Sequence, residues 1–181
     1  NYSGQLSVAV LNSKNSTVIS GTSNALNEVF ETLENQGRFN RKVKVDVASH
    51  SPQMDEITNP LEQSLSALKP QNTSVVFYST VTNTIKNGEE LNGAYWAANL
   101  RNTVQFSNVI QQISKENNAV YIEMSPHPTL IHAIKENLEN IDTKTLVIGS
   151  FSKENEEQVQ FYNNYTNLFA ANIKFDWHTI Y

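Results

Sequence analysis

The chain has no cysteine, and this absence excludes disulfide bonds and thiolate metal sites. It also fits a reducing compartment, so the predicted location is the cytoplasm. Basic residues are few: 13 Lys and Arg stand against 18 Asp and Glu, and the formal net charge is -5. A negative balance of this kind argues against a nucleic acid as partner.

Long apolar runs are absent too. No run approaches the roughly 20 residues that cross a bilayer, and the first residues lack the basic and apolar regions of a signal peptide. We therefore predict no membrane partner. The chain starts at Asn1 without an initiator methionine, and a strand-like pattern follows within six residues. We interpret the chain as part of a longer polypeptide.

The common catalytic motifs are also missing. The sequence has no G-x-S-x-G, no Walker loop and no G-x-G-x-x-G. No two of its histidines have metal-ligand spacing on a helix, so we predict no metal site. These histidines are His50, His127, His132 and His178.

Hydrophobic periodicity divides the chain into two different halves. Residues 1–47 read strand, strand, helix, strand, with the first two strands as a hairpin. In the remainder, strands and helices alternate, which favours a parallel α/β layer. Strands are predicted at 7–11, 17–20, 41–47, 75–78, 120–124 and 146–148. Helices are predicted between Thr22 and Gly37, and around 61–68, 91–99, 106–113, 130–138 and 159–169.

Two of these strands have distinct patterns. Residues 41–47 alternate, with three valines on one face and charged residues on the other. Residues 75–78, VVFY, form a continuous apolar run that is typical of a strand buried on both faces.

His50 stands at the end of the alternating run, in VDVASHSPQM. A loop after a strand is a common place for site residues, and the small Ala48 and Ser49 leave the approach to the ring open. These features make His50 a candidate catalyst. The alternative is a loop histidine that caps the following helix.

Three ordered motifs carry a family resemblance: VDVASHSPQM at 45–54, YWAANLRNTVQF at 95–106 and VYIEMSPHPTL at 120–130. In order and spacing they resemble the acyltransferase domain of modular type I polyketide synthases. The stretches 7–21 and 175–181 fit the same family. The resemblance covers essentially the whole chain.

The resemblance implies an α/β fold in three parts. Residues 1–48 would be the later part of a ferredoxin-like (α+β) small subdomain, whose first strand and helix lie upstream. Residues 49–150 would be the C-terminal part of an α/β-hydrolase-like large subdomain. Residues 151–181 would be the post-acyltransferase linker.

The resemblance also implies ping-pong acyl transfer. In the family, the serine of a G-H-S-x-G elbow takes an acyl group from acyl-coenzyme A. The serine then passes it to the phosphopantetheine thiol of an acyl carrier protein. His50 matches the general base, and Asn99 matches the residue whose backbone carbonyl orients that base. The expected partners are acyl-coenzyme A, the carrier protein, a neighbouring ketosynthase and other synthase domains. No cofactor is expected in the domain itself.

The chain departs from the family pattern in one important respect. It has no G-H-S-x-G, and neither Arg38 nor Arg101 matches the arginine that pairs with the extender carboxylate. We therefore expect the parent protein to be an enzyme and this chain by itself to be inactive. The missing half would be a separate chain or would have been lost.

The residues before the base imply a substrate preference. In the family, VASH-like tetrads accompany methylmalonyl extenders and HAFH accompanies malonyl. Val47, Ala48 and Ser49 are thus expected to set specificity, because Ser49 leaves room for an α-methyl group. His127, in the SPHP turn, is interpreted as structural, its imidazole bonding nearby backbone.

Two other functions remain open. The chain could be a non-catalytic docking or scaffold piece that binds a carrier protein or a neighbouring synthase domain. It could also be an unrelated α/β hydrolase that contributes only its histidine. A G-H-S-x-G motif upstream would favour catalysis over docking.

Overall fold

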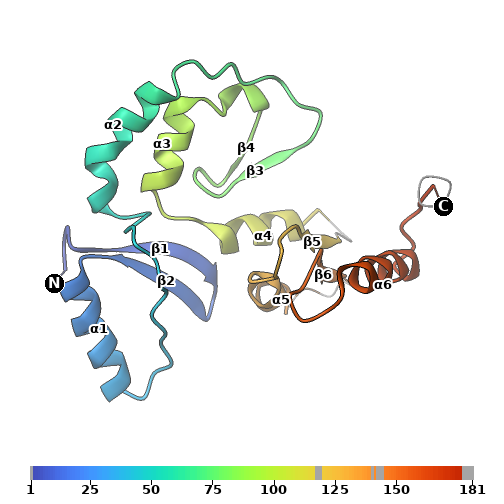
Figure 1. Cartoon of the computed structure of the whole chain (residues 1–181), viewed down its shortest axis with the longest axis horizontal. Helices are drawn as coiled ribbons and strands as arrows, with labels where there is room; N and C mark the ends of the chain where they lie inside the picture. Colours follow the sequence, from blue (N-terminus) through green and yellow to red (C-terminus); the bar gives the residue numbers. More distant parts are fainter. Residues whose placement is uncertain (1, 117–119, 140, 142–144, 177–181) are drawn as a thin grey trace. The chain divides into compact units, whose positions relative to one another are not determined.

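The computed structural model describes residues 2–116, 120–139, 141 and 145–176. His178 and the end of the predicted linker lie outside these residues. The chain forms two compact units, Asn1–Val109 and Ile110–Tyr181 (Figure 1). The predicted boundaries at 48 and 150 stay predictions.

The first unit begins with the predicted hairpin and helix. β1 (Leu6–Ser13) pairs antiparallel with β2 (Ser16–Gly21), and α1 (Ser23–Asn35) follows. Gly37, at φ +64°, comes just after the helix, where a left-handed residue commonly ends one. These elements confirm the first three predictions from periodicity.

The strand predicted at 41–47 is wrong. This segment is irregular, and Val43, Val45 and Val47 are 66%, 68% and 52% exposed. An alternating segment becomes a strand only when another strand takes up its backbone hydrogen bonds. Among the described residues, none pairs with it.

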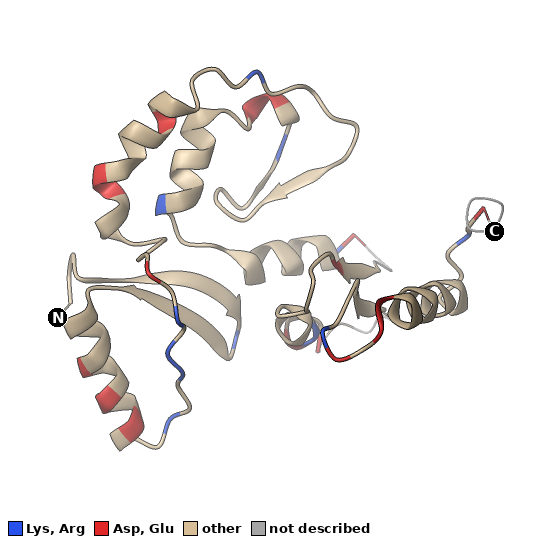
Figure 2. Cartoon of the chain, in the orientation of Figure 1, with Lys and Arg blue, Asp and Glu red and all other residues tan. Residues whose placement is uncertain are grey.

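Side-chain contacts and charge hold this segment against α1 instead. The Lys42 ammonium donates to Asn27 Oδ1 at 2.8 Å and lies 4.5 Å from the centre of the Phe30 ring. Figure 2 shows basic residues along the segment and acidic residues along α1. Opposite charges on exposed side chains attract weakly, so they support this packing without dominating it.

The rest of the first unit contains two short 3-10 turns, a hairpin and helices. The elements are η1 (Pro52–Met54), α2 (Asp55–Ser64), β3 (Phe77–Ser79), β4 (Thr84–Lys86), η2 (Gly88–Glu90), α3 (Gly93–Arg101) and α4 (Phe106–Ser114), which crosses into the second unit. α2 and α3 approach closely at Gly93, where an added Cβ would lie 2.9 Å from the Glu62 carbonyl oxygen.

The strand predicted at 75–78 is also corrected. β3 starts two residues later, and Val75 and Val76 are 73% and 58% exposed. The chain turns at once and pairs antiparallel with β4, so β3 is not a parallel strand covered on both faces. The short turn between them decides the pairing, and an apolar run by itself does not show that turn.

The second unit confirms the predicted α/β alternation. β5 (Tyr121–Glu123) pairs in parallel with β6 (Val147–Gly149), and α5 (Ile131–Leu138) lies between them in sequence. α6 (Glu157–Ala170) follows, and Asn164 joins it to the end of β6 by donating to the Gly149 carbonyl at 2.8 Å. Within the described residues, no helix is both long enough and apolar enough to cross a membrane.

Candidate active site

His50 lies in the loop between residues 41–47, here called the valine-rich segment, and η1. Its backbone is strained. Its φ is +60°, in the left-handed region. For a residue with a side chain, this conformation costs roughly 1–2 kcal/mol. Strain of this kind persists only where surrounding contacts enforce it, and it concentrates at functional sites.

Two hydrogen bonds enforce the backbone of His50. Its N–H donates to the carbonyl of Leu100 in α3, at 2.8 Å. Its own carbonyl accepts from the hydroxyl of Ser7 in β1, at 2.7 Å. Both peptide groups of the histidine are therefore held by elements that are distant in sequence.

A third contact fixes the ring. Nδ1 of His50 lies 2.8 Å from the carbonyl oxygen of Asn102. A carbonyl only accepts, so Nδ1 carries the proton and the neutral ring presents Nε2 as a base. The predicted acceptor was the carbonyl of Asn99, and the contact in the structure is to Asn102 instead. The difference arises because α3 ends at Arg101 and the chain turns to an extended conformation at Asn102.

Ser51 keeps the loop in shape. Its side chain is fully buried, and its hydroxyl donates to the Ala48 carbonyl at 2.6 Å. The same oxygen accepts from the Gln53 N–H at 3.3 Å and caps η1. Ser51, rather than His50, is therefore the cap. Ser51 was not among the residues predicted from the sequence, although serine followed by proline is a recognised start of a helical turn.

The three expected specificity residues precede His50 directly. Val47 is exposed, and Ala48 and Ser49 are half-buried. A cavity of about 360 Å³ in this unit is lined by Pro70, Val76, Leu91 and their neighbours. These specificity residues are not part of its lining.

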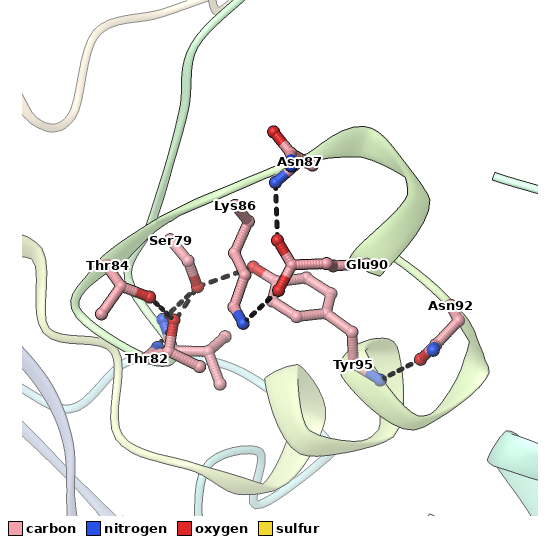
Figure 3. A network of polar contacts seen from close by, with 9 residues as sticks. Ser79, Thr82, Thr84, Lys86, Asn87, Glu90, Asn92 and Tyr95 are labelled. Atoms are coloured by element: carbon pink, nitrogen blue, oxygen red, sulfur yellow. Dashed lines mark hydrogen bonds and ion pairs between the residues drawn. The ribbon is translucent and has the colours of Figure 1, made fainter. Parts of the chain in front are cut away.

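The polar network of Figure 3 supports α3, which supplies the Leu100 carbonyl. Ser79 is fully buried, and its hydroxyl lies 3.0 Å from the Tyr95 hydroxyl. Its oxygen also accepts from the N–H groups of Val81 and Thr82, each at 3.2 Å. Asn92 caps the same helix by accepting from the Tyr95 N–H at 3.1 Å. The β3–β4 turn and α3 are thus joined by one buried hydroxyl.

Arg101 also has a structural partner. Its guanidinium pairs with the Asp55 carboxylate, joining the end of α3 to the start of α2. This arrangement gives the residue an architectural role, in keeping with its mismatch to the extender-binding arginine.

The SPHP turn of the second unit is organised by Glu123 rather than by its histidine. The Glu123 carboxylate accepts from the N–H groups of Thr129, Leu130 and Ile131, at 2.7, 2.8 and 3.1 Å. Partial burial raises the pKa of this carboxyl, but the bonds from Thr129, Leu130 and Ser125 outweigh it. The net pKa is below the ordinary value.

His127 does not make all the contacts expected of it. Its Nδ1 is buried without a hydrogen-bond partner among the described residues, so the prediction that the imidazole bonds nearby backbone is wrong for that atom. Within the same described part of the chain, no group of three or more potential ligands could hold a metal ion.

Comparison with known proteins places this geometry in a family. The model for the acyl transferase domain matches residues 2–174. The chain is 33% identical over 178 residues to the spectinabilin polyketide synthase system protein NorA' of Streptomyces orinoci, covering 98% of the chain and 5% of that protein. It is 34% identical over 179 residues to the polyketide synthase GfsA of Streptomyces halstedii, covering 98% of the chain and 2% of that protein.

Comparison with solved structures leads to the same family. The acyltransferase domain from module 8 of the salinomycin polyketide synthase superposes with a TM-score of 0.93 at 30% identity, covering 98% of this chain and 42% of that one. A malonyl-CoA:ACP transacylase from Synechocystis shares the fold alone, at 21% identity and a TM-score of 0.65. The chain therefore spans less than half of the solved domain, and it belongs to the acyl transferase domain family, with the α/β fold of polyketide synthase acyltransferases.

Proposed function

We propose that this chain is the base-bearing part of an acyltransferase that loads an extender unit from acyl-coenzyme A onto an acyl carrier protein. The observation that carries the proposal is the hydrogen bond that fixes the orientation of the His50 ring. Its Nδ1–H faces the Asn102 carbonyl at 2.8 Å, which leaves Nε2 free to accept a proton.

The chemistry follows as two half-reactions. In the first, Nε2 takes the proton of the serine hydroxyl as the serine oxygen attacks the thioester carbon. The tetrahedral intermediate then collapses, the carbon–sulfur bond breaks, and His50 gives its proton to the leaving coenzyme A thiol. In the second, His50 takes the proton of the phosphopantetheine thiol, whose sulfur attacks the acyl-serine. The serine oxygen leaves and recovers its proton from His50.

A carbonyl partner has a consequence for this base. It fixes the tautomer as a carboxylate would, but it carries no charge. It therefore stabilises the imidazolium less than the aspartate of a Ser-His-Asp triad does. A thiol is a better leaving group than an amine, so this weaker support suits thioester exchange.

The nucleophile is not in this sequence, which has no G-H-S-x-G. A base without its nucleophile does not turn over. We infer that the activity belongs to the parent protein and that the 181-residue chain alone is inactive. Acyl-coenzyme A, a carrier protein and a neighbouring ketosynthase are the proposed partners, in the cytoplasm.

Methylmalonyl is the proposed extender, with malonyl second. Ser49 is small and lies next to His50 in the chain. A phenylalanine at that position would fill the volume that an α-methyl group needs. An open site rejects the smaller malonyl group only weakly, because one methyl group contributes roughly 1–3 kcal/mol to discrimination.

A docking role is the second candidate. α6 exposes several large apolar side chains, with Phe161, Tyr162 and Phe169 at 42%, 50% and 59%. Exposed aromatic residues on one helix are common where another protein binds. A piece of this kind would hold a neighbouring synthase domain without taking part in the chemistry.

Intact-mass spectrometry tests these functions directly. The complete acyltransferase domain receives equal amounts of malonyl- and methylmalonyl-coenzyme A, with this chain as the control. We expect methylmalonyl adducts on the complete domain alone. Malonyl adducts alone would keep the enzyme and reverse the specificity. Absence of adducts on both proteins would favour docking, and an adduct on this chain would mean that the nucleophile has been misplaced.

A further inference from the structure

Ser7 and His50 meet although 43 residues separate them in the sequence. The Ser7 hydroxyl, on β1, donates to the His50 carbonyl at 2.7 Å. Ser7 is not among the site residues expected from the sequence. Its place in an alternating strand gives no sign of a role beyond the hairpin.

Three hydrogen bonds, here called anchors, hold His50, and they differ in the group that the partner residue supplies. Its N–H bonds the Leu100 carbonyl and its ring bonds the Asn102 carbonyl, so both partners are main-chain groups. These anchors persist whatever side chains residues 100 and 102 carry. The anchor from Ser7 is a side-chain hydroxyl. A substitution at Ser7 therefore removes this hydrogen bond, whereas substitutions at residues 100 and 102 leave the other two in place.

The position of this anchor matters for the ring. Bonds to the N–H and to the carbonyl lie on opposite sides of the His50 Cα, so together they fix both peptide planes and the direction of the Cα–Cβ bond. With φ at +60°, the residue would gain free energy by returning to a negative φ. Such a return would swing the ring away from Asn102.

β1 also positions the partner of the ring. The chain after α3 is bound along β1, because the Leu11 N–H donates to the Val104 carbonyl at 2.9 Å and the Val104 N–H to the Ala9 carbonyl at 2.8 Å. The Thr103 hydroxyl donates to the Val8 carbonyl at 2.7 Å. One strand thus carries both the Asn102 segment and, through Ser7, the His50 carbonyl.

We propose that Ser7 is a positioning residue for the catalytic base: its hydroxyl holds the strained His50 backbone so that the ring stays on the Asn102 carbonyl. The proposal rests on the proposed function, since it assigns Ser7 a part in the orientation of that base.

Kinetics of the complete acyltransferase domain test the proposal. The variants are Ser7→Ala, which removes the hydroxyl, and Ser7→Thr, which keeps it. Ser20→Ala is the matched control, because Ser20 is the register partner of Ser7 on β2. We expect Ser7→Ala to lower kcat about 10- to 100-fold with little change in KM, as misplacement of a catalytic group does. Ser7→Thr and Ser20→Ala should stay within about threefold of the parent.

Normal kcat in Ser7→Ala, a change in KM alone, or an equal loss in Ser20→Ala would overturn the proposal. A Ser7→Thr variant as slow as Ser7→Ala would also overturn it. If Ser7→Ala does not fold, Ser7→Cys replaces it, because a thiol is a similar size but a weak donor. A normal kcat in that variant would contradict the role.

His50→Ala in the same domain distinguishes a failure of the proposed function from a failure of the role proposed for Ser7. If His50→Ala keeps normal activity, the proposed function fails. If His50→Ala is inactive while Ser7→Ala is normal, only the role of Ser7 fails.

Discussion

The imidazole of His50 is bound by the carbonyl of Asn102, across 52 residues of sequence and at 2.8 Å. The relationship joins the loop before α2 to the end of α3. It fixes the tautomer of the neutral ring, and it makes the orientation of the ring depend on the backbone path after α3.

Substitutions at His50 should separate the effect of backbone strain on stability from the effect of the imidazole ring on activity. Asparagine accepts a left-handed φ more readily than a β-branched residue does, and the φ of His50 is +60°. We expect His50→Val to unfold at lower urea than His50→Asn, with a difference of about 1–2 kcal/mol in the free energy of unfolding. Self-acylation of the complete domain should be lost in both. Equal stabilities would mean that the loop relaxes its backbone.

A substitution at Ser49 tests the specificity. Ser49→Phe fills space beside His50, and we expect it to lower kcat/KM for methylmalonyl-coenzyme A relative to malonyl-coenzyme A by about 10- to 100-fold. Competition between the two substrates, read by intact mass, measures the ratio. Val45→Phe, in the exposed segment, is the control for the added ring. An unchanged ratio in Ser49→Phe would place the selecting contact elsewhere.

The buried hydroxyl of Ser79 should be important for stability. Ser79→Ala leaves two N–H groups and the Tyr95 hydroxyl without this partner, so we expect a loss of about 1–3 kcal/mol in the free energy of unfolding. Tyr95→Phe removes one hydroxyl only and should cost less. A double-mutant cycle by urea denaturation measures their coupling. Additive losses would contradict a direct Ser79–Tyr95 bond.

Glu123 should make stability dependent on pH. Its pKa is lowered in the folded state, so its contribution is fully present above the unfolded value, near 4.3, and disappears as pH falls through the lower folded value. We expect Glu123→Gln to cost about 1 kcal/mol at pH 7, since one oxygen becomes an amide nitrogen that cannot accept. Urea denaturation of both proteins at pH 7 and at pH 3.5 measures this cost. A difference that does not shrink at low pH would exclude the carboxylate as its source.

The valine-rich segment should make the isolated chain associate. Val43, Val45 and Val47 alternate as in a strand, are mostly exposed and have no strand beside them in the described structure. Open edges of this kind pair with other chains. We expect sedimentation velocity to show concentration-dependent association that Val45→Lys reduces, with Val8→Lys as the control. A monodisperse monomer at high concentration would contradict this expectation.

The sequence alone determined the features that depend on local order. The hairpin at the start, most of the helices and the parallel pair in the second unit follow from periodicity, because neighbouring residues set these patterns. The motifs around His50, Tyr95 and SPHP were sufficient to identify the family.

Only the tertiary structure decided the contacts between distant segments. Residues 41–47 have the pattern of a strand, but no strand pairs with them in the part of the chain that the structure describes. Residues 75–78 are less buried than predicted, because a tight turn pairs β3 with β4. The predicted acceptor for the His50 ring was the Asn99 carbonyl, but in the structure it is the Asn102 carbonyl, because the chain leaves the helix at Asn102. The contact of Ser7 with His50 became visible only in three dimensions. A hydroxyl's partner depends on which backbone group the fold brings to it, and a linear pattern does not encode that.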